Sequence, residues 1–176
     1  MLQPHLETPR LILRPFQFDD ADRVYELVND PLISDVTANI PHPYSLVLAK
    51  EWIASHSSNW EESTLAAFAI TRKDDQGLIG AISLMDINCE KAEVGYWLGQ
   101  AYWNQGYCSE ACVAISLFGF NTLNLSAISG RHLHRNPASG KVLIKNGFQF
   151  IGSRYMKTKK REHDELVDFY QLIKKI

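Results

Sequence analysis

The sequence predicts one α+β (mixed α/β) domain, with a largely antiparallel sheet and helices packed across it. The chain has 176 residues, a length that suits one compact domain with a sizeable core. Apolar residues make up 45% of the chain and charged residues 22%, as is ordinary for a globular protein. Extended and helical patterns follow one another in the order β-α-α-β-β-β-α-β-α-β-β. We place the domain over residues 8–174.

The N-terminal third predicts a strand followed by two helices. Residues 10–16 set three apolar side chains between two arginines, as a strand does. Asp19 or Asp20 suits the cap of a helix over residues 21–30, whose apolar positions share one face. The prolines of the segment "IPHPYS" delay the next helix until about Ser45.

The middle of the chain predicts three strands and then a helix. Two β-rich runs, over residues 65–73 and 77–87, are separated by the turn sequence "DDQG", which indicates a hairpin. A third strand covers residues 91–99. The polar loop "YWNQGYCSE" follows it and leads into an apolar helix from Ala111 onward.

The C-terminal third predicts a strand, a helix and two more strands. The helix begins at Pro137, which suits the first helical position, and ends before Gly147, which suits the position just past the end. The strands are expected over residues 126–133, 148–157 and 166–173.

Composition and charge indicate which classes of partner and which cellular compartment to expect. With a net charge of −2 and a pI near 6.3, the chain has no excess of positive charge, so its overall charge does not favour nucleic-acid binding. The sequence holds no apolar run near the ~20 residues of a membrane-spanning helix, and its first residues lack a signal-peptide pattern. Three cysteines form no secreted disulfide pattern. We expect a cytoplasmic monomer or homodimer without nucleic-acid or membrane partners.

The loop before the apolar helix has the form of an anion site. Gly106 is the position in "WNQGYCSEA" without a side chain to obstruct a ligand. Backbone amides that precede or open a helix lack intrahelical partners and can converge on a phosphate. These amides belong to Gln105, Gly106, Tyr107, Cys108 and Ser109. The alternative is an ordinary turn, with positive φ at Gly106 and Ser109 as the helix cap. The loop matches neither the P-loop nor the Rossmann pattern.

Several segments together resemble the GNAT acyl-CoA N-acyltransferases, in particular the branch of the ribosomal-protein N-acetyltransferases RimJ and RimL. They are "AEVGYWLG" before the loop, "NPASGKVLIKNGF" after the helix, "LETPRLILRPF" near the N-terminus and "PHPYSLVLAKEWI". The resemblance covers nearly the whole chain. The family's loop reads Gln or Arg, two residues, Gly, one residue, then Gly or Ala. Here Trp103, Gly106 and Cys108 occupy those positions.

The resemblance implies the GNAT fold, with a sheet of about six to seven strands, about four helices and strands that splay apart at the acetyl-CoA site. It implies that the loop amides bind the pyrophosphate of acetyl-CoA. Backbone groups of Tyr96, Trp97 and Leu98 would pair with the pantetheine arm, and a backbone N–H of Trp97 or Leu98 would stabilise the oxyanion. The family needs no metal.

Acetyl transfer to an amine needs a neutral amine, a stabilised oxyanion and help for the departing thiolate. Glu93 is the candidate base, with a purely structural carboxylate as the alternative. The resemblance implies that Asn136 contacts CoA and that Ser139 donates a proton or hydrogen bond to the thiolate. For both residues the alternative is helix capping. Lys145 is a candidate for neutralising CoA phosphates.

Other polar residues receive weaker assignments. His42 and Tyr44 border the acceptor groove by the same resemblance. His132 and His134 have strand spacing but no acid or cysteine beside them in the sequence, so we predict no metal site. The four-residue spacing of Cys108 and Cys112 suits helix packing, with a somewhat reactive thiol as the alternative. The charged segment 157–165 suits a solvated turn.

These features predict an acetyl-CoA-dependent N-acetyltransferase that acts on a primary amine, such as the N-terminal α-amine of a ribosomal protein. A second hypothesis keeps the chemistry and makes the acceptor a small molecule: a polyamine, an amino acid, a nucleotide-linked amine or an aminoglycoside antibiotic. A third is an acyl-CoA-binding regulatory domain without turnover.

Overall fold

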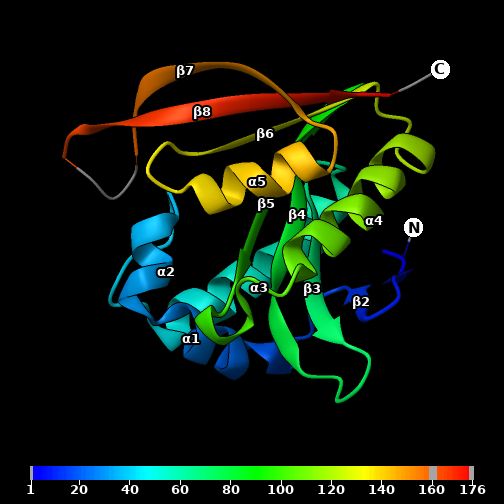
Figure 1. The fold of residues 1–176 in the computed structure, drawn as a ribbon. Coiled ribbons are helices and arrows are strands. Elements are labelled where there is room, and N and C mark those ends of the chain that lie inside the picture. Colours follow the sequence, from blue (N-terminus) through cyan, green and yellow to red (C-terminus); the bar gives the residue numbers. More distant parts are fainter. Residues whose placement is uncertain (1, 159–161, 175–176) are drawn as a thin grey trace.

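The computed structural model describes residues 2–158 and 162–174 of the chain. Over these residues it has eight strands in one sheet and five α-helices (Figure 1). The strands are β1 (Leu6–Glu7), β2 (Leu11–Arg14), β3 (Ala66–Arg72), β4 (Leu78–Asn88), β5 (Lys91–Leu98), β6 (Ala127–Leu133), β7 (Gln149–Lys157) and β8 (Asp164–Ile173). The helices are α1 (Ala21–Val28), α2 (Pro31–Val36), α3 (Leu46–Glu61), α4 (Tyr107–Asn121) and α5 (Pro137–Lys145).

The predicted fold class is confirmed, with two elements more than the sequence indicated. Strand β1 has two residues, too few for an alternating pattern to be read. Helix α2 has six residues, fewer than two turns, and is defined by its N-terminus: Pro31 takes the first position and the Asp30 side chain accepts a hydrogen bond from the Leu32 amide at 2.8 Å. The charged segment 157–165 lies partly outside the described residues.

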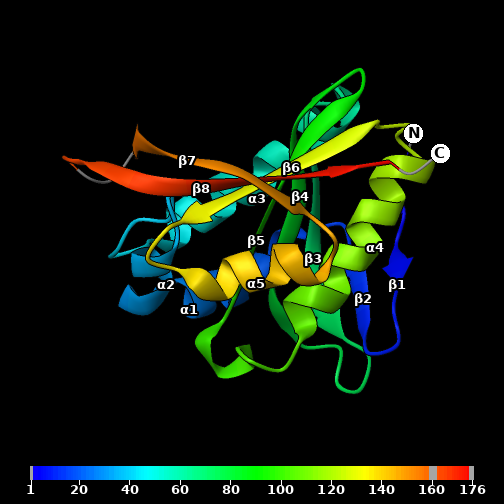
Figure 2. The same ribbon diagram turned by 45° about the horizontal axis from the view of Figure 1, so that its top comes forward.

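The sheet has the strand order β1-β2-β3-β4-β5-β6-β8-β7, and its pairs are antiparallel except for the parallel pair β5–β6. Helix α4 makes the crossover between these two strands, as a parallel connection requires. Helices α4 and α5 pack over one face of the sheet, and α1 and α3 over the other (Figures 1 and 2).

Two clusters of buried side chains form the core. The larger cluster joins α4 and α5 to the sheet, with Phe68, Ile115 and Leu143 fully buried. The smaller cluster lies on the opposite face and joins α1, α2 and α3 to the sheet. Side chains of a strand alternate between its faces, so Tyr96 packs against the α4/α5 cluster and Trp97 against the α1/α3 cluster. Strand β5 therefore presents one aromatic side chain to each layer of helices.

In the part of the chain that the structure describes, none of the helices has the length and apolar character needed to cross a bilayer.

Candidate active site

Strands β5 and β6 separate in the middle of the sheet. Their pairing runs from Lys91 opposite Ala127 to Val94 opposite Gly130. Strand β5 continues to Leu98 beside β4, and β6 continues to Leu133 beside β8. Residues 95–98 of β5 and 131–133 of β6 are thus no longer paired with each other, and the strands splay apart as the resemblance to the GNAT family implied. A ligand with amide groups can pair with backbone in such a gap as an added strand would.

The first turn of α4 begins at Gly106, which is the N-cap residue with φ +80° and ψ +2°. Of the two features of the ordinary-turn alternative, the positive φ at Gly106 is present, whereas Ser109 is the third helical residue and not the cap. The first hydrogen bond within the helix is donated by the Glu110 amide to the Gly106 carbonyl at 3.0 Å. The amides of Tyr107, Cys108 and Ser109 precede it, so the helix provides no carbonyl for them. They form the type of site that binds an anion.

Arg10, the residue just before β2, holds this turn in place. Its Nε lies 2.7 Å from Glu110 Oε2, its Nη1 donates to the Gln105 carbonyl at 3.0 Å, and its guanidinium lies 4.5 Å from the centre of the Tyr107 ring. This role was not predictable from the sequence, because Arg10 and Glu110 are 100 residues apart. The arginine that opens the first predicted strand carried no signal that it contacts the loop.

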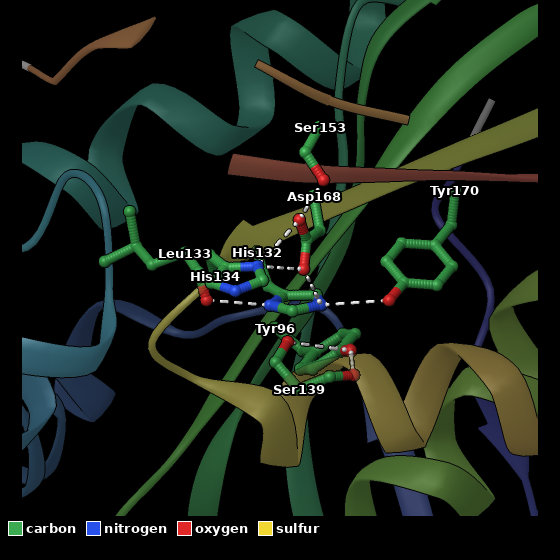
Figure 3. A network of polar contacts seen from close by, with 8 residues as sticks. All are labelled: Tyr96, His132, Leu133, His134, Ser139, Ser153, Asp168 and Tyr170. Carbon is green, nitrogen blue, oxygen red and sulfur yellow. Dashed lines mark hydrogen bonds and ion pairs between the residues drawn. The ribbon is translucent and has the colours of Figure 1, made fainter. Parts of the chain in front are cut away.

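Ser139 lies in the first turn of α5, where the side chain of Tyr96 reaches it from β5 (Figure 3). The Ser139 hydroxyl donates to Tyr96 Oη at 3.1 Å, and Tyr96 Oη donates to the Ser139 carbonyl at 2.8 Å. Burial raises the pKa of Tyr96 well above its usual value, so the phenol keeps its proton. From the sequence, only the backbone of Tyr96 was predicted to belong to the site, and its hydroxyl was not.

Asn136 occupies the N-cap position of α5 but makes no side-chain capping bond. Its Nδ2 donates instead to the Val36 carbonyl at 3.1 Å. Beside it, Arg135 Nη1 lies 3.0 Å from Asp35 Oδ2, and Arg135 Nη2 lies 3.3 Å from Glu165 Oε1. These bonds tie the end of α2 to the turn before α5. The CoA contact predicted for Asn136 remains a prediction.

Glu93 lies on the α1/α3 face of β5, the face of Trp97, and pairs with Arg131 of β6 at 2.9 Å from Oε1 to Nε. Its side chain is 18% exposed. Burial raises the pKa of Glu93, and the charge of Arg131 partly offsets that rise. A carboxylate with a raised pKa is suited to proton transfer, while the ion pair equally fits the structural alternative. The base role remains a prediction.

His132 and His134 share a partner that the sequence did not place beside them. Asp168 of β8 lies 3.8 Å from His132 Nε2 and 2.9 Å from His134 Nδ1, and it accepts a hydrogen bond from the Ser153 hydroxyl at 2.5 Å (Figure 3). Desolvation raises the pKa of Asp168, but the hydrogen bonds from Ser153 and His134 and the charge of the two histidines outweigh it, so the pKa is lowered. Among the described residues, no group of three or more His, Cys, Asp or Glu side chains could hold a metal ion.

The remaining predicted residues lie apart from this centre or contribute backbone. Tyr44 is partly buried in the α1/α3 cluster, and its amide donates to Asn29 Oδ1 at 2.9 Å, whereas His42 is exposed. Lys145 is exposed in the last turn of α5. Burial raises the pKa of Cys108 to about 12, as it does that of Cys112, which favours the packing role over a reactive thiol.

Comparison with known proteins fits this geometry. Residues 10–149 match the acetyltransferase (GNAT) domain family. The chain belongs to the GNAT acetyltransferase family. It is 30% identical to YoaA of Bacillus subtilis, named as an uncharacterised N-acetyltransferase, over 151 residues that cover 85% of each chain. The family resemblance predicted from the sequence is confirmed, and the chain is an N-acetyltransferase.

Solved GNAT structures share the fold over almost the whole chain. One is RimL, a ribosomal L7/L12 α-N-protein acetyltransferase in complex with coenzyme A, with a TM-score of 0.87, 17% identity and coverage of 97% of this chain and 98% of that one. Another is the ribosomal-protein-S5-alanine acetyltransferase of Vibrio fischeri, with a TM-score of 0.85, 20% identity and coverage of 97% and 96%. At these identities the likeness establishes the fold.

Acetyl-CoA, the acetyl donor of this family, fits the residues present. The amides that open α4 and the positive φ of Gly106 suit the pyrophosphate, and the gap between β5 and β6 suits an arm that contains amide groups.

Gly106→Val should weaken CoA binding by at least about tenfold, or ~1.4 kcal/mol. Valine is strained at a φ of +80°, and its Cβ would lie 3.5 Å from Arg10 Nη2, so the turn that presents the amides must change. Isothermal titration calorimetry with CoA measures the effect. Gly152→Val is the control, since Gly152 also has a positive φ (+142°) but lies on β7 with no atom within 4 Å of its Cβ position. An unchanged affinity for CoA in a folded Gly106→Val protein would show that the pyrophosphate does not bind at this turn.

Proposed function

We propose that this enzyme acetylates a primary amine by direct attack of the amine on acetyl-CoA in a ternary complex, with the N-terminal α-amine of a ribosomal protein as the leading acceptor. The observation that carries the proposal is the separation of β5 and β6. Groups suited to the donor, Ser139 and the α4 amides, lie on the α4/α5 face of the gap. Glu93 and Trp97 lie on the opposite face, so an amine that approaches from there meets the donor across the gap.

On the donor side, the bound thioester supplies an activated acetyl group. The amides of Tyr107, Cys108 and Ser109 hold the pyrophosphate, with Lys145 and Asn136 as further contacts to CoA. Backbone groups of residues 96–98 align the pantetheine arm, and an amide of Trp97 or Leu98 stabilises the oxyanion. Ser139 acts at the sulfur.

On the acceptor side, Glu93 takes the proton that the amine loses, directly or through a water molecule. An α-amine has a reference pKa of about 7.7–8.0 and a lysine side chain about 10.4, so the α-amine is the easier acceptor to deprotonate near neutral pH. His42 and Tyr44 are the proposed acceptor contacts, and Tyr44 packs in the cluster on the α1/α3 side of the sheet.

The choice of acceptor rests on this chemistry and on the shared fold. RimL and the Vibrio fischeri enzyme are named for acetylating ribosomal proteins, and both match this chain over nearly its full length. Because their sequence identity to this chain is low, that support is for a protein N-terminus as acceptor and not for one particular ribosomal protein.

The test is an acceptor panel. The protein is incubated with acetyl-CoA and either ribosomal-protein N-terminal peptides or the small amines named above, and released thiol is followed. Peptides with a free N-terminus should release thiol faster than small amines, and N-terminally blocked copies of the same peptides should release none. Preference for a small amine would establish the small-molecule alternative. Binding of CoA without turnover on any acceptor would establish the non-catalytic one.

A further inference from the structure

On the face of the sheet that carries Glu93, four side chains form a row that leads away from the gap. Glu93 of β5 pairs with Arg131 of β6 at 2.9 Å. Arg131 lies directly opposite Phe169 of β8 in the antiparallel pair of these two strands. The Cζ atom of Arg154, on β7, lies 4.2 Å from the centre of the Phe169 ring. Because β5, β6, β8 and β7 are neighbours in that order, the row is continuous from the gap to the edge of the sheet.

This row is open to solvent. In the part of the chain that the structure describes, the α1/α3 cluster takes side chains from β3, β4 and β5 but none from β6, β8 or β7. Arg131 and Arg154 are exposed, and Phe169 is partly exposed. An acceptor that places its amine beside Glu93 therefore has packed helices on one side and the open row on the other. The rest of the acceptor can extend along the row toward β7.

The two arginines of the row differ in what offsets their charge. Arg131 is paired with the carboxylate of Glu93. Arg154 is stacked on Phe169 instead, and among the described residues no carboxylate pairs with it. The N–H donors of a guanidinium lie in its plane, so stacking on a ring leaves them free to bind a carboxylate. Arg154 is therefore the cation of this row that can bind an anionic group of the acceptor.

The length of the row determines where that anionic group must be. The order β5-β6-β8-β7 contains three strand spacings of about 4.8 Å each, or about 14 Å in total. An extended peptide advances about 3.3 Å per residue, so about four residues span this distance. An acidic side chain at position 4 or 5 of a peptide thus reaches Arg154 when the α-amine lies at the gap. A single amino acid is too short to make both contacts.

We infer that the acceptor is a polypeptide whose N-terminal segment lies across β6 and β8, with an acidic residue at position 4 or 5 bound by Arg154. The inference rests on the proposed function, which places the acceptor amine beside Glu93, and it adds the class of sequence that the enzyme selects. Phe169 is the platform that orients the guanidinium, and Arg131 acts only on Glu93. Arg154 is thus a specificity-determining residue that contacts the acceptor far from the reacting atoms.

The test is a set of peptides that differ only in the place of one acidic residue. Each peptide has a free N-terminus and an amidated C-terminus and is otherwise built from serine and glycine. Aspartate is moved one position at a time along the peptide, and the parent peptide has none. Release of CoA thiol at saturating acetyl-CoA gives kcat/KM for each peptide. Aspartate at position 4 or 5 should raise kcat/KM about three- to tenfold over the parent, mainly through a lower KM. Aspartate nearer to the amine, or well beyond position 5, should give no gain.

Substitutions on β7 test whether Arg154 causes this preference. Arg154→Met should abolish the gain, so that the position of aspartate no longer matters. Arg154→Glu should reverse the preference and favour lysine over aspartate at the same position. Lys157→Met is the matched control, because Lys157 is three residues further along β7 and its side chain points to the opposite face. This control removes the same charge and should retain the full positional preference.

Turnover of the parent peptide separates this inference from the proposed function. If the parent is acetylated but aspartate at position 4 or 5 gives no gain, the inference is wrong while the proposed function stands. A gain that persists in Arg154→Met, or that vanishes in Lys157→Met as well, would show that Arg154 is not the contact. If no peptide is acetylated, the proposed function fails and this inference fails with it. If Arg154→Met does not fold, the peptide series on the wild type decides, because only a maximum at position 4 or 5 agrees with the length of the row.

Discussion

Ser139→Ala is expected to lower kcat by about ten- to a thousandfold, the range for removing one acid or transition-state donor. The KM for acetyl-CoA should change less, because the interaction strengthens mainly as the thiolate departs. The structure adds a second reason for the loss: alanine also removes the hydrogen bond that Tyr96 receives at 3.1 Å. Steady-state kinetics with the best acceptor of the panel, at saturating concentrations of both substrates, measures the effect.

The matched control for that variant is Ser126→Ala. The hydroxyl of Ser126 likewise donates one hydrogen bond within the protein, to the Glu90 backbone carbonyl at 3.1 Å, but it lies just before β6 and away from α5. Its kcat should equal that of the wild type. Should Ser139→Ala turn over normally under conditions where chemistry limits the rate, Ser139 has no part in departure of the thiolate and serves only to join α5 to β5.

Features that depend on local geometry were predictable from the sequence. Gly106 has a positive φ where the loop turns into α4, whose apolar side chains pack in the core. A glycine in a polar segment just before an apolar run is typical of such a turn, so this conformation could be predicted from the sequence. The ends of α5 follow the same logic: Pro137 takes the first helical position, and Gly147 has φ +83° just past the last turn. Neighbouring residues alone set these conformations.

Contacts that join distant parts of the chain were not predictable. Strand pairing brings Asp168 opposite His132, and no property of either segment fixes that register. Tyr96 contacts Ser139 because the first turn of α5 lies beside the side chain of Tyr96, although the two residues are 43 positions apart in the sequence. Of the candidate site, the sequence supplied the residue types on each strand and helix. The hydrogen-bond partners of Tyr96 and Ser139 required the arrangement in space.

Glu93→Gln is expected to lower kcat/KM for the amine about a hundredfold near neutral pH, within the usual range for losing a general base. Glutamine preserves the shape of the side chain, and its Oε1 can still accept from Arg131 Nε, which lies 2.9 Å from the carboxylate. Acetyl-CoA affinity should stay the same, because the α4 amides and the β5 backbone are untouched. The rate of the variant should recover partly at higher pH, where the amine is already neutral.

The pH profile separates a catalytic Glu93 from a structural one. A base acts in its ionised form, so activity should rise with pH as Glu93 loses its proton. Burial raises the pKa of Glu93, so this limb should lie above the ordinary carboxyl range, and the charge of Arg131 keeps it from lying higher still. Arg131→Met removes that charge and should therefore move the limb to higher pH while leaving the plateau rate nearly unchanged.

The decisive comparison is Arg131→Met made in the Glu93→Gln background. Glutamine does not titrate, so removing the charge of Arg131 should no longer shift the profile if that charge acts through the Glu93 carboxylate. Circular dichroism confirms that the four proteins are equally folded before their profiles are compared. A wild-type pH–rate profile in Glu93→Gln, or the same shift from Arg131→Met in both backgrounds, means that the amine loses its proton by another route. Glu93 would then serve only to pair β5 with β6 through Arg131.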